Sequence, residues 1–236
     1  MAKSPEQILA NYRQHVERSK LGFDAARTAS NPDLAAYNLE QGLKAYLMQG
    51  LVGWRCGIMS PVSPFREALT FVRQGYLAWQ TMNGSNTTRT LDLPLEKAFF
   101  VAFLVNERAI TVDLDDLVAD RLLDGNLGLG LQGEWDEETW ASGLEQLRQI
   151  KGSTLAVESY TTYHQLLCSS QESEAKAAVE KATSQFEKRK SNGFYSSGEP
   201  TDGGGFYNPI TVDYRLAAIM KKIGYKGDSV HSWQWG

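Results

Sequence analysis

A histidine and a cysteine four residues apart form a pair of side chains suited to nucleophilic or metal chemistry. On a helix, His164 and Cys168 would lie on one face. A thiol beside an imidazole can act as a nucleophile, and both groups bind metal ions. A structural zinc site needs two more ligands, and none lies nearby in the sequence. We therefore expect two ordinary, partly buried side chains, and no metal, cofactor or catalytic residue.

Glycines recur at short intervals in the middle of the chain, which raises the question of a phosphate-binding loop. They are Gly125, Gly128, Gly130 and Gly133. A phosphate loop follows a strand and ends in Lys-Ser or Lys-Thr, and this segment has neither feature. The surrounding acidic side chains would also repel a phosphate group. We therefore predict a loop punctuated by glycines, without nucleotide binding.

Acidic side chains concentrate in one stretch of the chain. Between Asp113 and Glu145 the sequence holds ten acidic residues and one arginine, a formal charge of −9. The whole chain carries −4, so the other residues sum to +5. An acidic surface steers and selects basic partners, and the tryptophans in this stretch, Trp135 and Trp140, are typical of binding hot spots. The plainer interpretation is a solvated helical face with acidic first turns.

Three aspartates at the start of this stretch could hold a divalent cation through oxygen ligands. Asp113, Asp115 and Asp116 do not match the spacing of a calcium-binding loop, which ends in a bidentate glutamate. Two carboxylates far apart in the sequence could still hydrolyse a glycosidic bond. A hydrolase with distant carboxylates is therefore the least favoured of the functions that we carry forward.

The elements that must position these residues have the periodicity of helices. Apolar side chains recur at steps of three and four along nearly every regular segment, and strand patterns are weak. The expected helical segments are 4–28, 33–57, 64–83, 95–106, 113–123, 134–167 with a break near Gly152, 172–190 and 213–223. We predict an all-α fold of about eight to ten helices packed in antiparallel pairs. It resembles a tetratricopeptide protein in architecture, without that repeat's period or pattern residues.

Composition and length exclude several classes of protein. The chain has 236 residues, enough to bury a large core, and its two cysteines cannot make a disulfide framework. The net negative charge argues against nucleic-acid binding. The longest apolar stretch, 98–106, has nine residues and is too short to span a membrane, and the first twenty residues lack the core of a signal peptide. We expect one cytoplasmic domain over 1–236, and the alternative is a division into 1–133 and 134–236.

The C-terminal segment, 202–236, is the most distinctive part of the sequence. Three consecutive glycines and an Asn-Pro turn precede a short helix that Asp213 caps and Gly224 ends. The tail then carries Trp233 and Trp235. We expect this aromatic tail to be ordered and to seal the core, and the alternative is a surface for a ligand or partner.

Four pieces of this region resemble a known family. KRKSNGFYSS, the DGGG and YNP turn, VDYRLAAIMKKIG and HSWQW are similar to the C-terminal parts of helical immunity proteins. Those proteins guard bacteria against toxins delivered by type VI secretion or polymorphic-toxin systems. The resemblance implies a cytosolic, non-enzymatic protein that binds one cognate toxin and blocks its active site. The family has no fixed toxin-contact motif, so the resemblance assigns no binding residues.

The acidic stretch supplies the candidate contact residues instead. Toxin domains that act on nucleic acid have basic clefts, and an acidic surface could enter such a cleft by mimicking the substrate's charge. The residues that we expect to contact the toxin are Asp115, Asp116, Asp120, Glu134, Trp135, Asp136, Glu137 and Glu138. The main alternative is a helical scaffold that binds a peptide or a partner helix in a groove lined by aromatic side chains.

Overall fold

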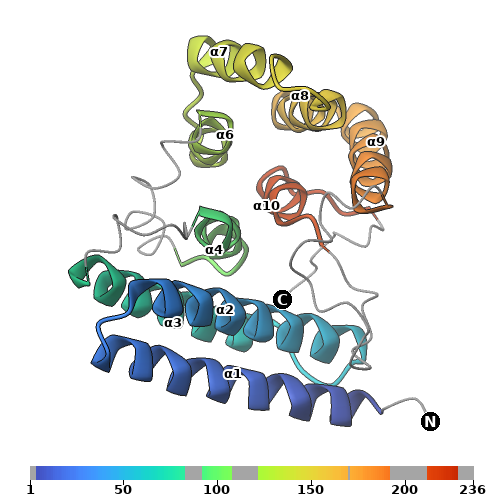
Figure 1. Cartoon of the computed structure of the whole chain (residues 1–236). Helices are drawn as coiled ribbons and strands as arrows, with labels where there is room; N and C mark the ends of the chain where they lie inside the picture. The colour runs from blue at the N-terminus through green and yellow to red at the C-terminus, as the bar shows by residue number, and fades with distance from the viewer. Residues whose placement is uncertain (1–3, 83–91, 108–121, 170, 192–211, 228–236) are drawn as a thin grey trace. The chain divides into compact units, whose positions relative to one another are not determined.

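The computed structural model describes residues 4–82, 92–107, 122–169, 171–191 and 212–227, and within these ranges every regular element is an α-helix (Figure 1). The described residues form nine helices and no strand, which confirms the all-α prediction. Contacts divide the chain into two compact units, one holding α1 to α4 and the other α6 to α10. No helix in the described ranges is long and apolar enough to cross a membrane.

The first unit is built from three long helices and one shorter helix. Its helices are α1 (Pro5–Thr28), α2 (Pro32–Arg55), α3 (Val62–Thr81) and α4 (Asp92–Leu104). α1 packs along α2 and α2 along α3, while α4 packs on α3 and α2 (Figure 1). Ser4 and Gln7 form a capping box at the start of α1, and the Asn31 side chain accepts a hydrogen bond from the Leu34 N–H to begin α2.

The core of the first unit follows the predicted helical periodicity. Leu39 and Leu43 of α2 and Phe65 and Leu69 of α3 are each at most 1% exposed. The apolar stretch that begins at Ala98 is buried on nearly all sides within and just after α4, as expected for a short internal helix.

The second unit is built from shorter helices. They are α6 (Leu122–Gln132), α7 (Glu137–Arg148), α8 (Thr154–Cys168), α9 (Glu172–Ser191) and α10 (Tyr214–Lys222). α6 packs on α7 and α8, α8 packs on α9, and α10 contacts α6, α8 and α9. The predicted break near Gly152 is confirmed, and this glycine has a φ of +84°. Asp213 and Gly224 cap the two ends of α10 as predicted.

Residues 122–132 form the helix α6, so the prediction of a loop punctuated by glycines is wrong for them. Leu123, Leu127 and Leu131 recur every four residues and are all buried, so one helical face is apolar despite the glycines. Each glycine weakens a helix by about 1 kcal/mol relative to alanine, and tertiary packing offsets this cost. Among the four glycines of this stretch, only Gly133 has a left-handed φ, +93°, and it ends the helix.

Two further predictions concern the division of the chain and two segments outside the described residues. A boundary at 133/134 would separate α6 from α7, α8 and α10, whereas contacts place all four helices in one unit. The expected acidic helix at 113–123 lies outside the described residues up to position 121, and the aromatic tail lies outside them from position 228. The tetratricopeptide likeness stays a prediction.

Candidate functional site

Five of the eight predicted contact residues form one continuous stretch that joins α6 to α7. We call residues Glu134–Glu138 the acidic segment. The four acids, Glu134, Asp136, Glu137 and Glu138, are all exposed, and Trp135 is half-buried among them. The other three predicted residues, Asp115, Asp116 and Asp120, lie outside the described residues. The described part of the site therefore presents four carboxylates within five positions.

A cluster of rings lies beneath the acidic segment. The Trp135 indole stacks on the His164 imidazole with ring centroids 4.7 Å apart and planes 19° apart. Trp140 lies 4.8 Å from Trp135 and 5.5 Å from His164, and it is 3% exposed. Tyr160 meets Trp140 edge to face at 6.0 Å. The rings join the start of α7 to α8, so the acidic segment rests on a packed aromatic base.

The end of α6 and the start of α7 fix the ends of the acidic segment. The Gly133 N–H donates to the Gly130 carbonyl, and the Glu134 N–H donates to the Leu129 carbonyl at 2.9 Å. This is the Schellman pattern of a helix that ends at a left-handed glycine. At the other end, the Asp136 carboxylate accepts hydrogen bonds from the N–H groups of Glu138 and Thr139 and from the Thr139 hydroxyl. Asp136 is therefore the N-cap of α7.

The cap hydrogen bonds favour the ionised form of one carboxylate. The bonds from the Thr139 hydroxyl and N–H, with a smaller one from the Glu138 N–H, lower the pKa of Asp136 below its ordinary value of 3.8. Because the native pKa is the lower one, the unfolded chain takes up the proton first as the pH falls. The stability that this carboxylate contributes is full well above pH 3.8 and is lost as the pH falls through the native pKa.

Asp136→Asn should make this pH dependence visible. Asparagine also caps helices but does not titrate in this range. We expect the wild-type protein to be more stable than the variant near neutral pH, and this difference to shrink on acidification through the native pKa of Asp136. Urea unfolding at a series of pH values measures it. A difference that stays constant or grows at low pH would contradict the assignment of Asp136 as an ionised cap.

His164 and Cys168, the candidate nucleophile or metal pair, lie at the edge of this site. His164 Nε2 is 3.3 Å from a carboxylate oxygen of Glu137, and their side chains are 25% and 70% exposed. Cys168 is exposed, not partly buried as predicted, and the partial loss of water around its thiol, with a smaller contribution from the Glu137 charge, raises the thiol pKa. A raised thiol pKa means less thiolate at neutral pH, so the thiol is a weak nucleophile. The described residues contain no cluster of three groups that could hold a metal ion.

One acid of the predicted stretch is directed into the protein instead. Asp124 of α6 is 3% exposed and forms a two-point ion pair with Arg215 of α10, with N–O distances of 2.7 and 3.1 Å. The Tyr160 hydroxyl donates to the same carboxylate at 2.8 Å. Close by, the Tyr163 hydroxyl donates to Asp213. Asp124 therefore joins α6, α8 and α10 and adds no charge to the surface.

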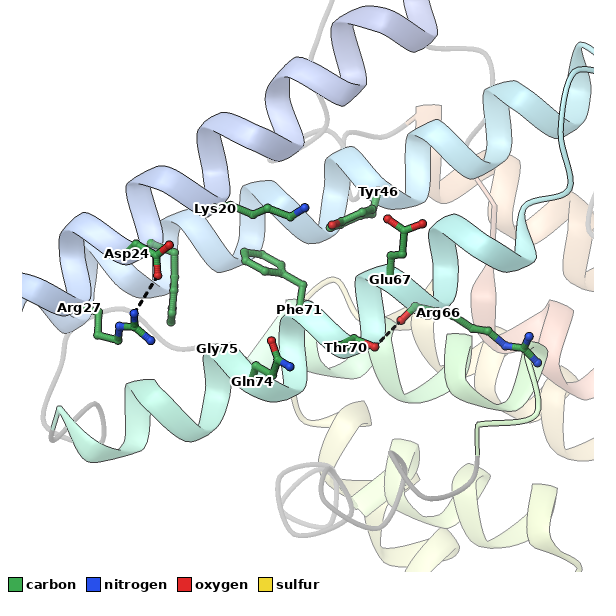
Figure 2. A pocket seen from close by; sticks show the side chains of 11 residues that line it. Lys20, Asp24, Arg27, Tyr46, Arg66, Glu67, Thr70, Phe71, Gln74 and Gly75 are labelled. Atoms are coloured by element: carbon green, nitrogen blue, oxygen red, sulfur yellow. Dashed lines mark hydrogen bonds and ion pairs between the residues drawn. The ribbon is translucent and has the colours of Figure 1, made fainter.

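The first unit holds a separate feature, a groove of about 530 Å³ between α1 and α3 (Figure 2). Its floor includes Phe23, Tyr46 and Phe71, whose rings are about 6 Å apart in neighbouring pairs. The Lys20 ammonium lies 5.5 Å above the centre of the Tyr46 ring. The Glu67 carboxylate lines the other wall and accepts a hydrogen bond from a serine hydroxyl. The groove thus combines aromatic rings with charges of both signs, and no motif in the sequence predicted it.

Comparisons of the chain with protein-family models, with curated proteins and with solved structures found no match.

Proposed function

We propose that this protein is an immunity protein: it binds a cognate bacterial toxin in the cytoplasm and blocks the toxin's active site. The observation that carries the proposal is the exposed acidic segment, which presents four carboxylates beside a half-buried tryptophan. Its partner would carry a basic surface or cleft. Complementary charge speeds association and selects the partner, and an aromatic side chain at the centre supplies contact area.

Local geometry supports binding more than catalysis at this site. The four carboxylates are exposed, that of Asp136 caps α7, and that of Glu137 lies 3.3 Å from His164 Nε2. The candidate nucleophile nearby is a thiol whose pKa is raised. An inhibitor needs a rigid, charged surface that fits another protein, and the acidic segment with its aromatic base has that composition.

Co-expression tests the proposal directly. The chain would be produced together with the protein encoded immediately upstream of its gene, in cells that this neighbour harms. We expect growth to be restored and the two proteins to purify as a complex. A neighbour that is harmless, or that stays harmful when the chain is present at equal amounts without forming a complex, would contradict the proposal.

Charge reversal tests the contact surface. In the variant Glu134→Lys, Glu137→Lys, Glu138→Lys, we expect Kd for the partner to rise at least a hundredfold at low salt, mainly through slower association, because like charges would then meet. Asp136 stays unchanged so that α7 keeps its cap. The matched control is Glu172→Lys, Glu174→Lys, Glu180→Lys on α9. It changes the net charge by the same amount, and two of its three substitutions also lie in the first turn of a helix. Equal Kd values for the two variants would exclude the acidic segment as the contact surface.

A second candidate function is favoured by the groove of the first unit. A cavity of about 530 Å³ lies in the range of ligand sites, and its paired helical walls suit a short helix or peptide. The protein would then be a scaffold that holds a partner peptide on the rings of Phe23, Tyr46 and Phe71. A partner that binds equally well to the wild-type protein and to the charge-reversal variant would support this candidate.

A further inference from the structure

A buried asparagine ties the acidic segment to α6. Asn126 is 1% exposed, and both ends of its amide bind the backbone of Asp136. The Asp136 N–H donates to Asn126 Oδ1 at 3.2 Å, and Asn126 Nδ2 donates to the Asp136 carbonyl. A buried amide must have its polar atoms paired, and here a segment ten residues away supplies both partners. These two hydrogen bonds therefore fix the backbone of Asp136 relative to α6.

A glycine of the same helix fixes the neighbouring tryptophan. A Cβ atom at Gly130 would lie 2.7 Å from Cε3 of Trp135, which is closer than real Cβ contacts, and 3.1 Å from Cδ1 of Leu167, which is a tight contact. The indole thus lies directly against the backbone of α6. Together with the left-handed turn at Gly133, these contacts hold the acidic segment at three successive places.

We infer that Asn126 is a positioning residue for partner binding, which holds the acidic segment in one conformation before the partner arrives. This inference rests on the proposed function. Binding is weakened when a loop must be ordered in the same step, and a segment that is already ordered avoids that loss. Asn126 is uncharged and buried, so it acts on a cationic partner only through the segment that it holds.

The experiment uses the full-length chain and a fluorescent oligo-arginine peptide as a probe of a cationic partner surface. We expect Asn126→Ala to raise Kd about tenfold, the effect of freeing a few backbone torsions. The slope of Kd against salt concentration should not change, because every charge remains. The charge-reversal variant Glu134→Lys, Glu137→Lys, Glu138→Lys should instead lose both affinity and salt dependence.

A matched control separates positioning from general stability. Asn38→Ala removes another buried amide, 9% exposed, whose Nδ2 donates to the Leu34 carbonyl in the first unit. We expect Asn38→Ala to lower stability without changing Kd for the peptide. Amide hydrogen exchange at Glu134 and Asp136 should be at least tenfold faster in Asn126→Ala and unchanged in Asn38→Ala. If Asn126→Ala does not fold, Asn126→Asp keeps the acceptor, loses the donor, and should show both effects in the same direction.

The results separate the positioning role of Asn126 from the role of the acidic segment as a contact surface. Binding that is lost on charge reversal but equal in the Asn126 and Asn38 variants overturns the positioning role alone. Unchanged amide exchange in the Asn126 variants overturns it as well. Peptide binding that survives charge reversal overturns the acidic segment as a contact surface, and with it a role for Asn126 in binding.

Discussion

Asp124→Leu alone is expected to destabilise the protein by about 3 kcal/mol, because it leaves the half-buried Arg215 guanidinium without its carboxylate. The Arg215 side chain is 15% exposed and that of Asp124 is 4% exposed, so little water can replace the lost partner. The same change also removes the acceptor of the Tyr160 hydroxyl. Urea unfolding at neutral pH measures the loss as a lower transition midpoint.

The double variant Asp124→Leu, Arg215→Met shows whether the charge or the packing is responsible. Removing both charges removes the desolvation cost of each, so we expect the double variant to recover most of the stability that the single variant loses. The control is Glu145→Ala, which breaks an exposed ion pair with Arg148 and should cost less than about 1 kcal/mol. A single variant as stable as this control would contradict the buried-pair account, as would a double variant no better than the single one.

The sequence predicted the last helix from the residues at its two ends. Asp213 and Gly224 each act within a few residues of the end of α10 that they cap, so the information lies in neighbouring positions. The exposure of the four acids in the acidic segment also followed from their charge. These features depend on chemistry that a short stretch of chain contains.

Features that depend on distant parts of the chain could not be predicted in this way. α6 has poor helix propensity, and its leucine face is stabilised by packing on α7 and α8. Asp124 resembled its exposed acidic neighbours, and its partner Arg215 lies 91 residues further along the chain. The pairing of Asn126 with the backbone of Asp136 has no signature beyond two polar residues. In each case the three-dimensional contact, and not the residue type, determines the role.

Trp140→Ala is the second substitution from which we expect a large loss of stability, because the role of Trp140 also depends on packing. Trp140→Ala removes a side chain that is 3% exposed and that contacts the rings of Trp135, Tyr160 and His164. Truncation of a buried tryptophan costs about 3–5 kcal/mol, so we expect a loss of that size in urea unfolding. Because Trp135 would lose the ring beneath it, the acidic segment should also bind the oligo-arginine peptide several-fold more weakly under conditions in which the variant is folded.

A buried tryptophan in the first unit provides the comparison. Trp79 is 9% exposed and its indole N–H donates to the Pro32 carbonyl, so Trp79→Ala should also destabilise the protein strongly. It lies in a different unit from the acidic segment, so peptide binding by the folded variant should be unchanged. If Trp140→Ala does not fold, Trp140→Phe keeps a ring with less contact area and should give a smaller loss of both stability and affinity. Equal peptide binding by the folded Trp140 and Trp79 variants would contradict a role for the aromatic base in binding. The contacts with α6 would then be enough to hold the acidic segment in place.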